Sequence, residues 1–331
     1  MRKSFAYLCF LFLLPLASAL SQDRPDYVLV IHGGAGNIAS ESMSDERIED
    51  YHQKLREALA AGEEILKADG SSLDAVEAAV RILEDSPLFN AGRGAVFTID
   101  GANELDAAVM CGESLNAGAV AGITTIKNPV TLARKVMEVS PHVMMIGKGA
   151  EQFGYEMGME VVDPSYFFDQ RRWDQYREFL RRQQGNRGAL SPDGKMGTVG
   201  AVALDKHGNL AAATSTGGMT GKRYGRVGDV PVIGAGTYAN NASCAVSATG
   251  HGEYFIRHVV AHHISARMLY GHASLVDASN EIIHDLASIQ ANGGVIAVDK
   301  KGNISMPFNT SAMFRGFVRS DGQSYTGIFS D

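Results

Sequence analysis

The chain has 331 residues, of which 45% are hydrophobic and 20% charged, and its formal net charge at pH 7 is −7. This length can bury the core of one large α/β domain or of two smaller ones, and no Pro- or Ser-rich linker divides it. The excess of acidic residues disfavours a nucleic-acid or anionic-membrane partner.

The first 19 residues have the pattern of a secretory signal peptide. Arg2 and Lys3 precede an apolar run, and the small residues Ala17-Ser18-Ala19 follow it. The run is shorter than the ~20 residues that span a bilayer, and no later stretch is a candidate membrane helix. We therefore expect an exported chain that has no membrane contact once the signal is removed, with a bacterial periplasm as its compartment. Secretion and an uncleaved anchor are the alternatives.

The next 65 or so residues predict a strand and two helices. "YVLVIHGGAG", from Tyr27, is an apolar run ending in glycines, which is typical of a central strand covered on both faces. Ser44 can cap a helix that stops before Gly70. Ser71 and Asp74 have capping-box-like spacing at the start of a second helix.

The middle of the chain combines a turn signal, a short helix and a polar run. Asp100-Gly101 between apolar runs predicts a hairpin, and Asn128-Pro129 predicts a helix start. From Phe168 to Gly197 the chain is rich in charge and then in Gly, Ser and Pro. We expect a surface helix in its first half and a mobile segment in its second.

After Thr198 the pattern returns to apolar runs. "VALDKHGNLAA" (202–212) and "IAVDKKGNISM" (296–306) both predict hairpins, and one or two helices are expected over 253–289. Helices mixed with meandering hairpins favour a layered α+β sandwich over a doubly wound sheet.

Two motifs resemble binding sites without fitting them. Gly34-Ala-Gly36-Asn-Ile-Ala39 matches the dinucleotide pattern, but no helix is expected to start on those glycines, so a close-packed turn is favoured. His258 and His262 have i, i+4 spacing on an expected helix, yet no third ligand is evident. We expect a structural histidine pair there. Cys111 and Cys244 could form one disulfide in an oxidising compartment.

Thr198 is the one candidate nucleophile that the spacing suggests. A threonine hydroxyl needs a base, and the α-amino group of the same residue, with an unperturbed pKa of roughly 7.7 to 8.0, would serve once the Gly197–Thr198 bond is cut. The polar run before it is where a chain could be opened without loss of core. On spacing alone an ordinary strand threonine is the favoured interpretation.

Several long motifs reverse that preference. The chain resembles the plant-type asparaginases, or isoaspartyl peptidases, of the N-terminal nucleophile hydrolases from about Tyr27 to its C-terminus. The resemblance is carried by "HGGAG" (32–36), "SPLFNAGRGAVFT" (86–98), "GTVGAVALD" (197–205), "AAATSTGGMTGKRYGRVGDVPVIGAGTYA" (211–239) and "ATGHGEYFIR" (248–257).

The resemblance implies an αββα sandwich and autocleavage before Thr198. It implies an α subunit of residues 20–197, with a linker at about 168–197, and a β subunit of residues 198–331 that together form one structural domain. Relatives also imply an (αβ)₂ assembly. The implied catalytic residues are Thr198 as nucleophile, Thr216 as partner of its hydroxyl, Asn90 beside its amine, and Thr249 with the Gly250 N–H as the oxyanion hole.

The implied substrates are β-aspartyl dipeptides and L-asparagine. Arg226 would hold the substrate carboxylate, and Asp229 with the Gly252 carbonyl would hold its amine. No cofactor is required, but relatives imply a structural sodium ion bound mainly by backbone carbonyls. The corresponding positions are Leu83, Glu84, Ser86, Phe89, Ala91 and Arg93.

Two other functions remain as alternatives. Glycosylasparaginases use the same chemistry on a sugar-linked asparagine, but their pattern has an aspartate where Gly197 stands here. A non-catalytic exported protein could bind small acidic metabolites through Arg226 and Asp229.

Overall fold

The computed structural model describes residues 24–185 and 197–330. The predicted signal peptide and the second half of the polar run therefore lie outside the described residues. The helices are α1 Asp45–Lys67, α2 Ser72–Glu84, α3 Pro129–Val139, α4 Gly147–Glu156, α5 Gln170–Gly185, α6 Gly252–His258, α7 Val260–Gly271 and α8 Leu275–Ser288.

Within the described residues, twelve strands form two sheets. Their bounds are β1 Val28–Gly36, β2 Leu105–Cys111, β3 Ala117–Ile123, β4 Met144–Ile146, β5 Val199–Leu204, β6 Leu210–Thr216, β7 Thr237–Ala239, β8 Cys244–Gly250, β9 Gly293–Asp299, β10 Ile304–Ser305, β11 Ala312–Arg319 and β12 Ser324–Phe329. The larger sheet has the order β12-β11-β1-β5-β6-β2-β3-β4, and the smaller has the order β10-β9-β8-β7.

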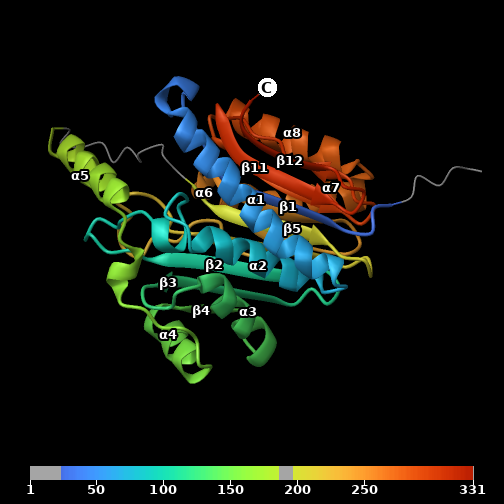
Figure 1. The fold of residues 1–331 in the computed structure, drawn as a ribbon, viewed down its shortest axis with the longest axis horizontal. Helices are drawn as coiled ribbons and strands as arrows, with labels where there is room; N and C mark the ends of the chain where they lie inside the picture. The colour runs from blue at the N-terminus through green and yellow to red at the C-terminus, as the bar shows by residue number, and fades with distance from the viewer. Residues whose placement is uncertain (1–23, 186–196, 331) are drawn as a thin grey trace, which may run out of the picture.

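The two sheets stack face to face and are covered by helices on both outer faces (Figure 1). Apolar side chains of β1, β5 and β6 meet those of β8 and β9 between the sheets, where Val30, Val202 and Ile296 are fully buried. Helices α1 to α3 pack on the outer face of the large sheet, and α7 and α8 pack on the small one. The predicted αββα sandwich is confirmed.

The start of the chain follows its sequence signals closely. Ser44 caps α1 by accepting a hydrogen bond from the Arg47 N–H at 3.2 Å, and Ser71 caps α2 through the Asp74 N–H at 3.1 Å. β1 runs through its glycines to Gly36, and the next long helix begins only at Asp45. No helix starts on those glycines, so the geometry that a dinucleotide site requires is not formed there.

Both predicted hairpins with Asp-Lys-x-Gly-Asn turns are present, as β5–β6 and β9–β10. In each turn the first aspartate, Asp205 or Asp299, accepts a hydrogen bond from the N–H of the asparagine four residues on. Each turn glycine has a positive φ, which a β-carbon would disfavour.

The hairpin predicted around Asp100-Gly101 is wrong, although the turn itself is present. The Gly101 N–H bonds the Thr98 carbonyl, but the residues before the turn form no strand. Their backbone pairs instead with the loop after β6, since the Ile99 N–H bonds the Lys222 carbonyl and the Gly221 N–H bonds the Phe97 carbonyl. Across the turn the Thr98 N–H still bonds the Ala102 carbonyl at 2.8 Å, but no strand pairing continues from it.

The helix predicted to carry both His258 and His262 is also wrong. Val259 adopts a left-handed conformation with φ of 49°, which ends α6 and begins α7, so the two histidines lie on different helices. Three helices occupy this region where one or two were expected. The i, i+4 geometry for metal binding is therefore absent from this described part of the chain.

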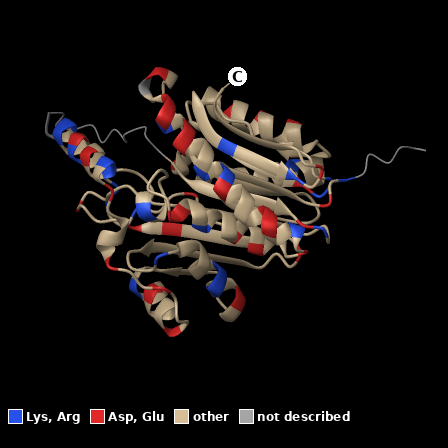
Figure 2. Ribbon diagram, in the orientation of Figure 1, with Lys and Arg blue, Asp and Glu red and all other residues tan. Residues whose placement is uncertain are grey.

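The charged run after Phe168 begins as the expected helix, α5. It lies at an edge of the molecule and carries both basic and acidic residues along its length, whereas the strands in the middle of the fold carry few charges (Figure 2). Tyr176 and Phe179 on its inner side are buried. Among the described residues, no helix is long and apolar enough to cross a membrane.

Candidate active site

Thr198 lies at the entrance of β5, deep in the larger sheet. β5 pairs with β1 on one side and β6 on the other, so the residue is only 6% exposed. Its hydroxyl donates to Oγ1 of Thr216, the last residue of β6, at 3.2 Å. The predicted contact between these two threonines is present.

The carbonyl oxygen of Gly197 lies between two donors. The Asn90 side-chain amide donates to it at 2.7 Å, and the Thr216 hydroxyl donates at 3.1 Å. Asn90 is itself fixed, because its Oδ1 accepts from the Val96 N–H at 3.0 Å and its Nδ2 also donates to the Gly218 carbonyl at 2.8 Å. Donors placed in this way stabilise negative charge that develops on a carbonyl oxygen.

Gly34 makes the closest approach to the Gly197–Thr198 bond. Its φ of +108° favours glycine, and a β-carbon there would lie 2.9 Å from the Gly197 Cα and 3.1 Å from the Thr198 nitrogen. Only glycine fits this position without a shift of the backbone. The "HGGAG" motif therefore brings β1 directly against the predicted cleavage point.

Thr249 and Gly250 end β8 on the smaller sheet and face the same region. Thr249 is fully buried, and its hydroxyl oxygen accepts a hydrogen bond from the Ala35 N–H at 3.3 Å. Ala35 follows Gly34, so the two sheets meet beside the Gly197–Thr198 bond. Packing leaves no room for a side chain at Gly250, where a β-carbon would lie 2.6 Å from the Asn292 carbonyl oxygen.

Arg226 and Asp229 lie in the loop after β6 and reach the start of α6. A β-carbon on Gly252 would lie 2.8 Å from Arg226 Nη2 and 2.9 Å from Asp229 Oδ1, so this glycine lies against both side chains. On the other side, Gly218 is close to Arg226, and its N–H donates to the Thr216 hydroxyl at 3.0 Å. Every residue expected in the catalytic and substrate-binding set therefore falls in one connected region.

Asp229 has an unusual electrostatic setting for a carboxylate. Its Oδ2 is buried and has no hydrogen-bond partner among the described residues. Burial raises the pKa of this carboxyl to about 7, although the nearby Arg226 acts in the opposite direction. A cationic group brought beside Oδ2 would relieve this cost.

Sequence reasoning missed Glu253, which is the present partner of Arg226. Its two carboxylate oxygens accept from Arg226 Nε at 3.0 Å and Nη2 at 3.1 Å. This bidentate geometry is the one in which a guanidinium also binds a free carboxylate. The only available signal was the position of Glu253 directly after Gly252 in the "ATGHG" motif.

His32 links the nucleophile to the space between the sheets. Its ring contacts the Thr198 carbonyl through Nδ1 at 3.1 Å and the Ser247 hydroxyl through Nε2 at 2.8 Å. A carbonyl only accepts, so Nδ1 carries the proton and Nε2 accepts from Ser247. The Ser247 oxygen then accepts from Thr214 at 2.8 Å. Burial lowers the pKa of His32 to about 3, so the ring stays neutral and holds Thr198 in place.

The loop predicted to bind sodium is tightly folded between α2 and β2. A β-carbon at Gly92 would lie 2.3 Å from the Glu84 carbonyl oxygen, and one at Gly94 would lie 2.1 Å from the Phe89 carbonyl oxygen. Backbone carbonyl oxygens of this loop thus pack against its glycines. Oxygen ligands of this hard type suit an alkali cation. The Glu84 carboxyl is not free for this purpose, since it accepts from Asn128 and from the Val130 N–H.

Side chains offer no alternative metal site within residues 24–185 and 197–330, where no three His, Cys, Asp or Glu residues cluster to hold an ion. Cys111 and Cys244 are both free thiols in this structure.

Comparison with known proteins assigns the family. A family model described as "Asparaginase" matches residues 25–328, which is nearly the whole described chain. The chain belongs to the asparaginase family. Its α+β sandwich is the fold of the N-terminal nucleophile hydrolases, and the predicted amidohydrolase class is confirmed.

Relatives match over almost their full length. An isoaspartyl peptidase of Salmonella typhimurium is 51% identical over 312 residues, covering 92% of this chain and 99% of that protein. A plant-type L-asparaginase of Pyrococcus abyssi is 42% identical over 301 residues, covering 88% of this chain and 96% of that protein. An isoaspartyl peptidase/L-asparaginase of Bos taurus is 40% identical over 304 residues, covering 91% of this chain and 96% of that protein.

Proposed function

We propose that this asparaginase-family chain cleaves itself between Gly197 and Thr198 and then hydrolyses β-aspartyl dipeptides and L-asparagine. The observation that carries the proposal is the geometry at this bond. The Thr198 hydroxyl is hydrogen-bonded to Thr216, and the Gly197 carbonyl lies between the Asn90 amide and the Thr216 hydroxyl. Relatives named for these activities support the substrate class.

Self-cleavage would proceed through an ester. Thr198 Oγ1 adds to the Gly197 carbonyl carbon, and Asn90 and Thr216 stabilise the oxyanion that forms. The C–N bond then breaks, the proton lost by the Thr198 hydroxyl passes to the Thr198 nitrogen, and water hydrolyses the ester. The products are a Gly197 carboxylate on the α subunit (20–197) and a free Thr198 amine on the β subunit (198–331). Both remain in one domain, because β5 stays paired between β1 and β6.

Substrate hydrolysis would use the same hydroxyl with a different base. The free Thr198 amine accepts the hydroxyl proton, and Oγ1 attacks the side-chain carbonyl of the substrate. Thr249 and the Gly250 N–H stabilise the resulting oxyanion, the departing amine takes the proton, and a β-aspartyl ester remains. Water then attacks the ester and restores the enzyme. Loss of the Thr249 hydroxyl should lower kcat by ~10²- to 10³-fold.

The aspartyl head group would be held by opposite charges. Arg226 binds its α-carboxylate, while Asp229 and the Gly252 carbonyl accept from its α-ammonium. Glu253 already forms a bidentate pair with Arg226, so the substrate carboxylate takes the place of a carboxylate that the protein itself supplies. The ammonium would donate to the buried Oδ2 of Asp229, which has no hydrogen-bond partner among the described residues, and so would offset the cost of burying its charge.

Kinetics on three substrates test this assignment. We expect turnover of both β-aspartyl-leucine and L-asparagine, and far lower kcat/KM on N-acetylglucosaminyl-asparagine than on either. A strong preference for the sugar-linked substrate would instead identify a glycosylasparaginase. Calorimetric binding of aspartate by fully cleaved protein without turnover of any substrate would identify a binding protein.

The loop from Leu83 to Arg93 is proposed as a structural sodium site, with backbone carbonyls as ligands. Replacing sodium chloride by choline chloride at equal ionic strength should then lower the Tm, since an ion that binds only the folded state stabilises it. An equal Tm in both salts would argue against the site.

We also propose an (αβ)₂ assembly and export through the N-terminal signal. Sedimentation of the purified protein and N-terminal sequencing of its α subunit test these two points.

A further inference from the structure

A cavity of about 640 Å³ lies against Gly197, and neither Arg226 nor Asp229 lines it. Gly34, Asn90 and Gly197 form the wall nearest to the Gly197–Thr198 bond. Its volume is in the range of small-molecule sites. None of the catalytic steps above uses the rest of this cavity.

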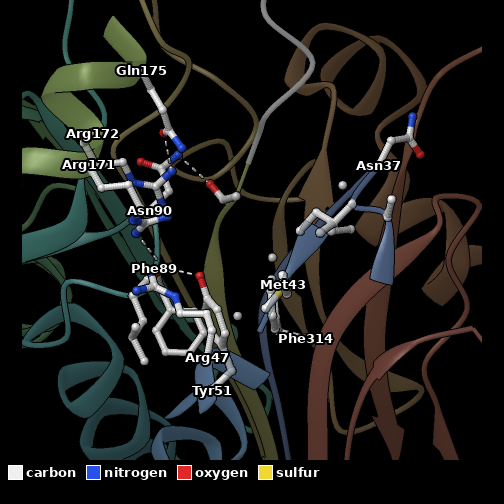
Figure 3. A pocket seen from close by; sticks show the side chains of 18 of the residues that line it. Asn37, Met43, Arg47, Tyr51, Phe89, Asn90, Arg171, Arg172, Gln175 and Phe314 are labelled. Atoms are coloured by element: carbon white, nitrogen blue, oxygen red, sulfur yellow. Dashed lines mark hydrogen bonds between the residues drawn. The ribbon is translucent and has the colours of Figure 1, made fainter. Parts of the chain in front are cut away.

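Three arginines line the cavity, on the same side as Asn90 (Figure 3). Arg47 comes from α1, where its guanidinium lies 5.3 Å from the centre of the Tyr51 ring. Arg171 and Arg172 come from the first turn of α5. Arg171 Nη2 donates to the carbonyls of Pro87 and Leu88, and these two bonds fix it at the wall.

Arg172 is also held by neutral acceptors. Its Nε donates to the Gly94 carbonyl at 2.8 Å, and its Nη1 donates to the Gln175 side chain at 3.2 Å. Burial, together with the positive charges of Arg171 and Arg47, lowers the pKa of this guanidinium to about 10. The three cations are therefore close enough to repel one another.

Within the described residues, little negative charge balances this cluster. Asp169 is the one carboxylate paired to it, 3.8 Å from Arg171 Nε. Neither Arg47 nor Arg172 forms an ion pair with any described residue, and Arg172 Nη2 and the whole Arg47 guanidinium have no acceptor there. Partly buried cations without counter-charge favour an anionic ligand.

The chemistry of the reaction indicates which anion these arginines would bind. The amine that leaves the substrate must take its proton from the Thr198 nitrogen, so the departing group lies on the side of Thr198 that Gly197 occupies before cleavage. A departing amino acid carries an α-carboxylate one carbon from that amine. Opposite the arginines, the apolar side chains of Met43 and Phe314 form the other wall (Figure 3).

We propose that this cavity is the leaving-group subsite, in which Arg47 and Arg172 bind the α-carboxylate of an apolar C-terminal residue of a β-aspartyl dipeptide. The proposal rests on the proposed function and refines it. L-asparagine releases ammonia, which has no carboxylate, so these arginines favour dipeptides over asparagine.

The test compares two substrates that differ only in this charge, β-aspartyl-leucine and β-aspartyl-leucinamide. For the cleaved wild-type enzyme we expect kcat/KM to favour the free acid by about 10- to 100-fold, the range of a charge-assisted hydrogen bond. Arg47→Gln should reduce this preference about tenfold. Arg177→Gln removes the same charge from the exposed side of α5, away from the cavity, and should leave the preference unchanged.

Two results would overturn the proposal. One is equal kcat/KM for acid and amide in the wild type, which would assign the arginines to another anion, such as the Gly197 carboxylate that cleavage creates. The other is an equal loss of preference in the Arg47 and Arg177 variants, which would indicate a general field of positive charge. Failure to hydrolyse either substrate, by contrast, would refute the proposed function itself.

Discussion

Asp229 carries a buried carboxyl group whose charge is costly to the folded protein. Its pKa is raised to about 7, above the ordinary value of an unfolded aspartate, so the folded state binds a proton more readily than the unfolded state does. This group therefore lowers the free energy of unfolding as the pH rises from about 4 to 7. The proposed function would account for the cost, because the charged form of Asp229 is the one that would receive the substrate ammonium.

Asp229→Asn should stabilise the ligand-free protein while it abolishes hydrolysis. We expect the Tm advantage of the variant to grow between about pH 4 and pH 7 and then to level off, because only the wild type must carry the buried charge. Asp100→Asn, which removes an exposed carboxylate, is the matched control and should show no such growth. A Tm difference that is the same at every pH would show that Asp229 ionises without cost.

Among single residues, the sequence predicts those that belong to long motifs. It does not predict those whose role is to position another residue through a contact distant in the chain. The motifs name Thr216, Asn90 and Arg226; the structure places the first two at the Gly197–Thr198 bond and Arg226 against Gly218 and Gly252. Glu253 and His32 were not assigned roles. Their roles follow from contacts with residues 27 and 166 positions away, and no local pattern encodes such distances.

Among the elements, β1 has the closest relation to cleavage. Its run through the "HGGAG" glycines brings Gly34 against Gly197, and the pairing of β1 with β11 is irregular between His32 and Gly34. An irregularity of this kind bends a strand locally. Because Gly34 has no β-carbon, the bent strand can pack directly against Gly197.

Gly34→Ala should slow self-cleavage by tenfold or more, because a β-carbon would displace the Gly197–Thr198 peptide and because φ of +108° is strained for alanine. A denaturing gel followed over time would measure the rate. Gly149→Ala in α4, where a β-carbon would meet no atom within 4 Å, is the control and should cleave like the wild type. Equal rates for the two variants would mean that this contact has no part in cleavage.

Elements with a complete local signal were predicted well, and those settled by distant contacts were not. Helix caps at Ser44 and Ser71 and the two Asp-x-x-Gly-Asn turns are local, and each is present. The arm before Asp100 was expected to pair with the next strand but pairs with residues 221–222. Propensity is only a weak guide where tertiary pairing decides.

The whole molecule explains how a cut in the chain can leave the fold intact. Residues on both sides of Gly197 contribute to the same sheet, since β5 lies between β1 and β6 and both helix layers pack on paired strands. The new N-terminus would therefore begin inside a sheet that is already paired. Patterning favours a layered sandwich and the family resemblance implies its αββα layers, but the order of strands depends on pairings that only the folded chain reveals.

Intact-mass measurement of the purified protein tests the central claim most directly. We expect two chains whose masses place the break between Gly197 and Thr198, and a single inactive chain for Thr198→Ala. A wild-type protein that remains one chain and yet hydrolyses β-aspartyl peptides would contradict the account, because no free Thr198 amine would then exist to act as the base.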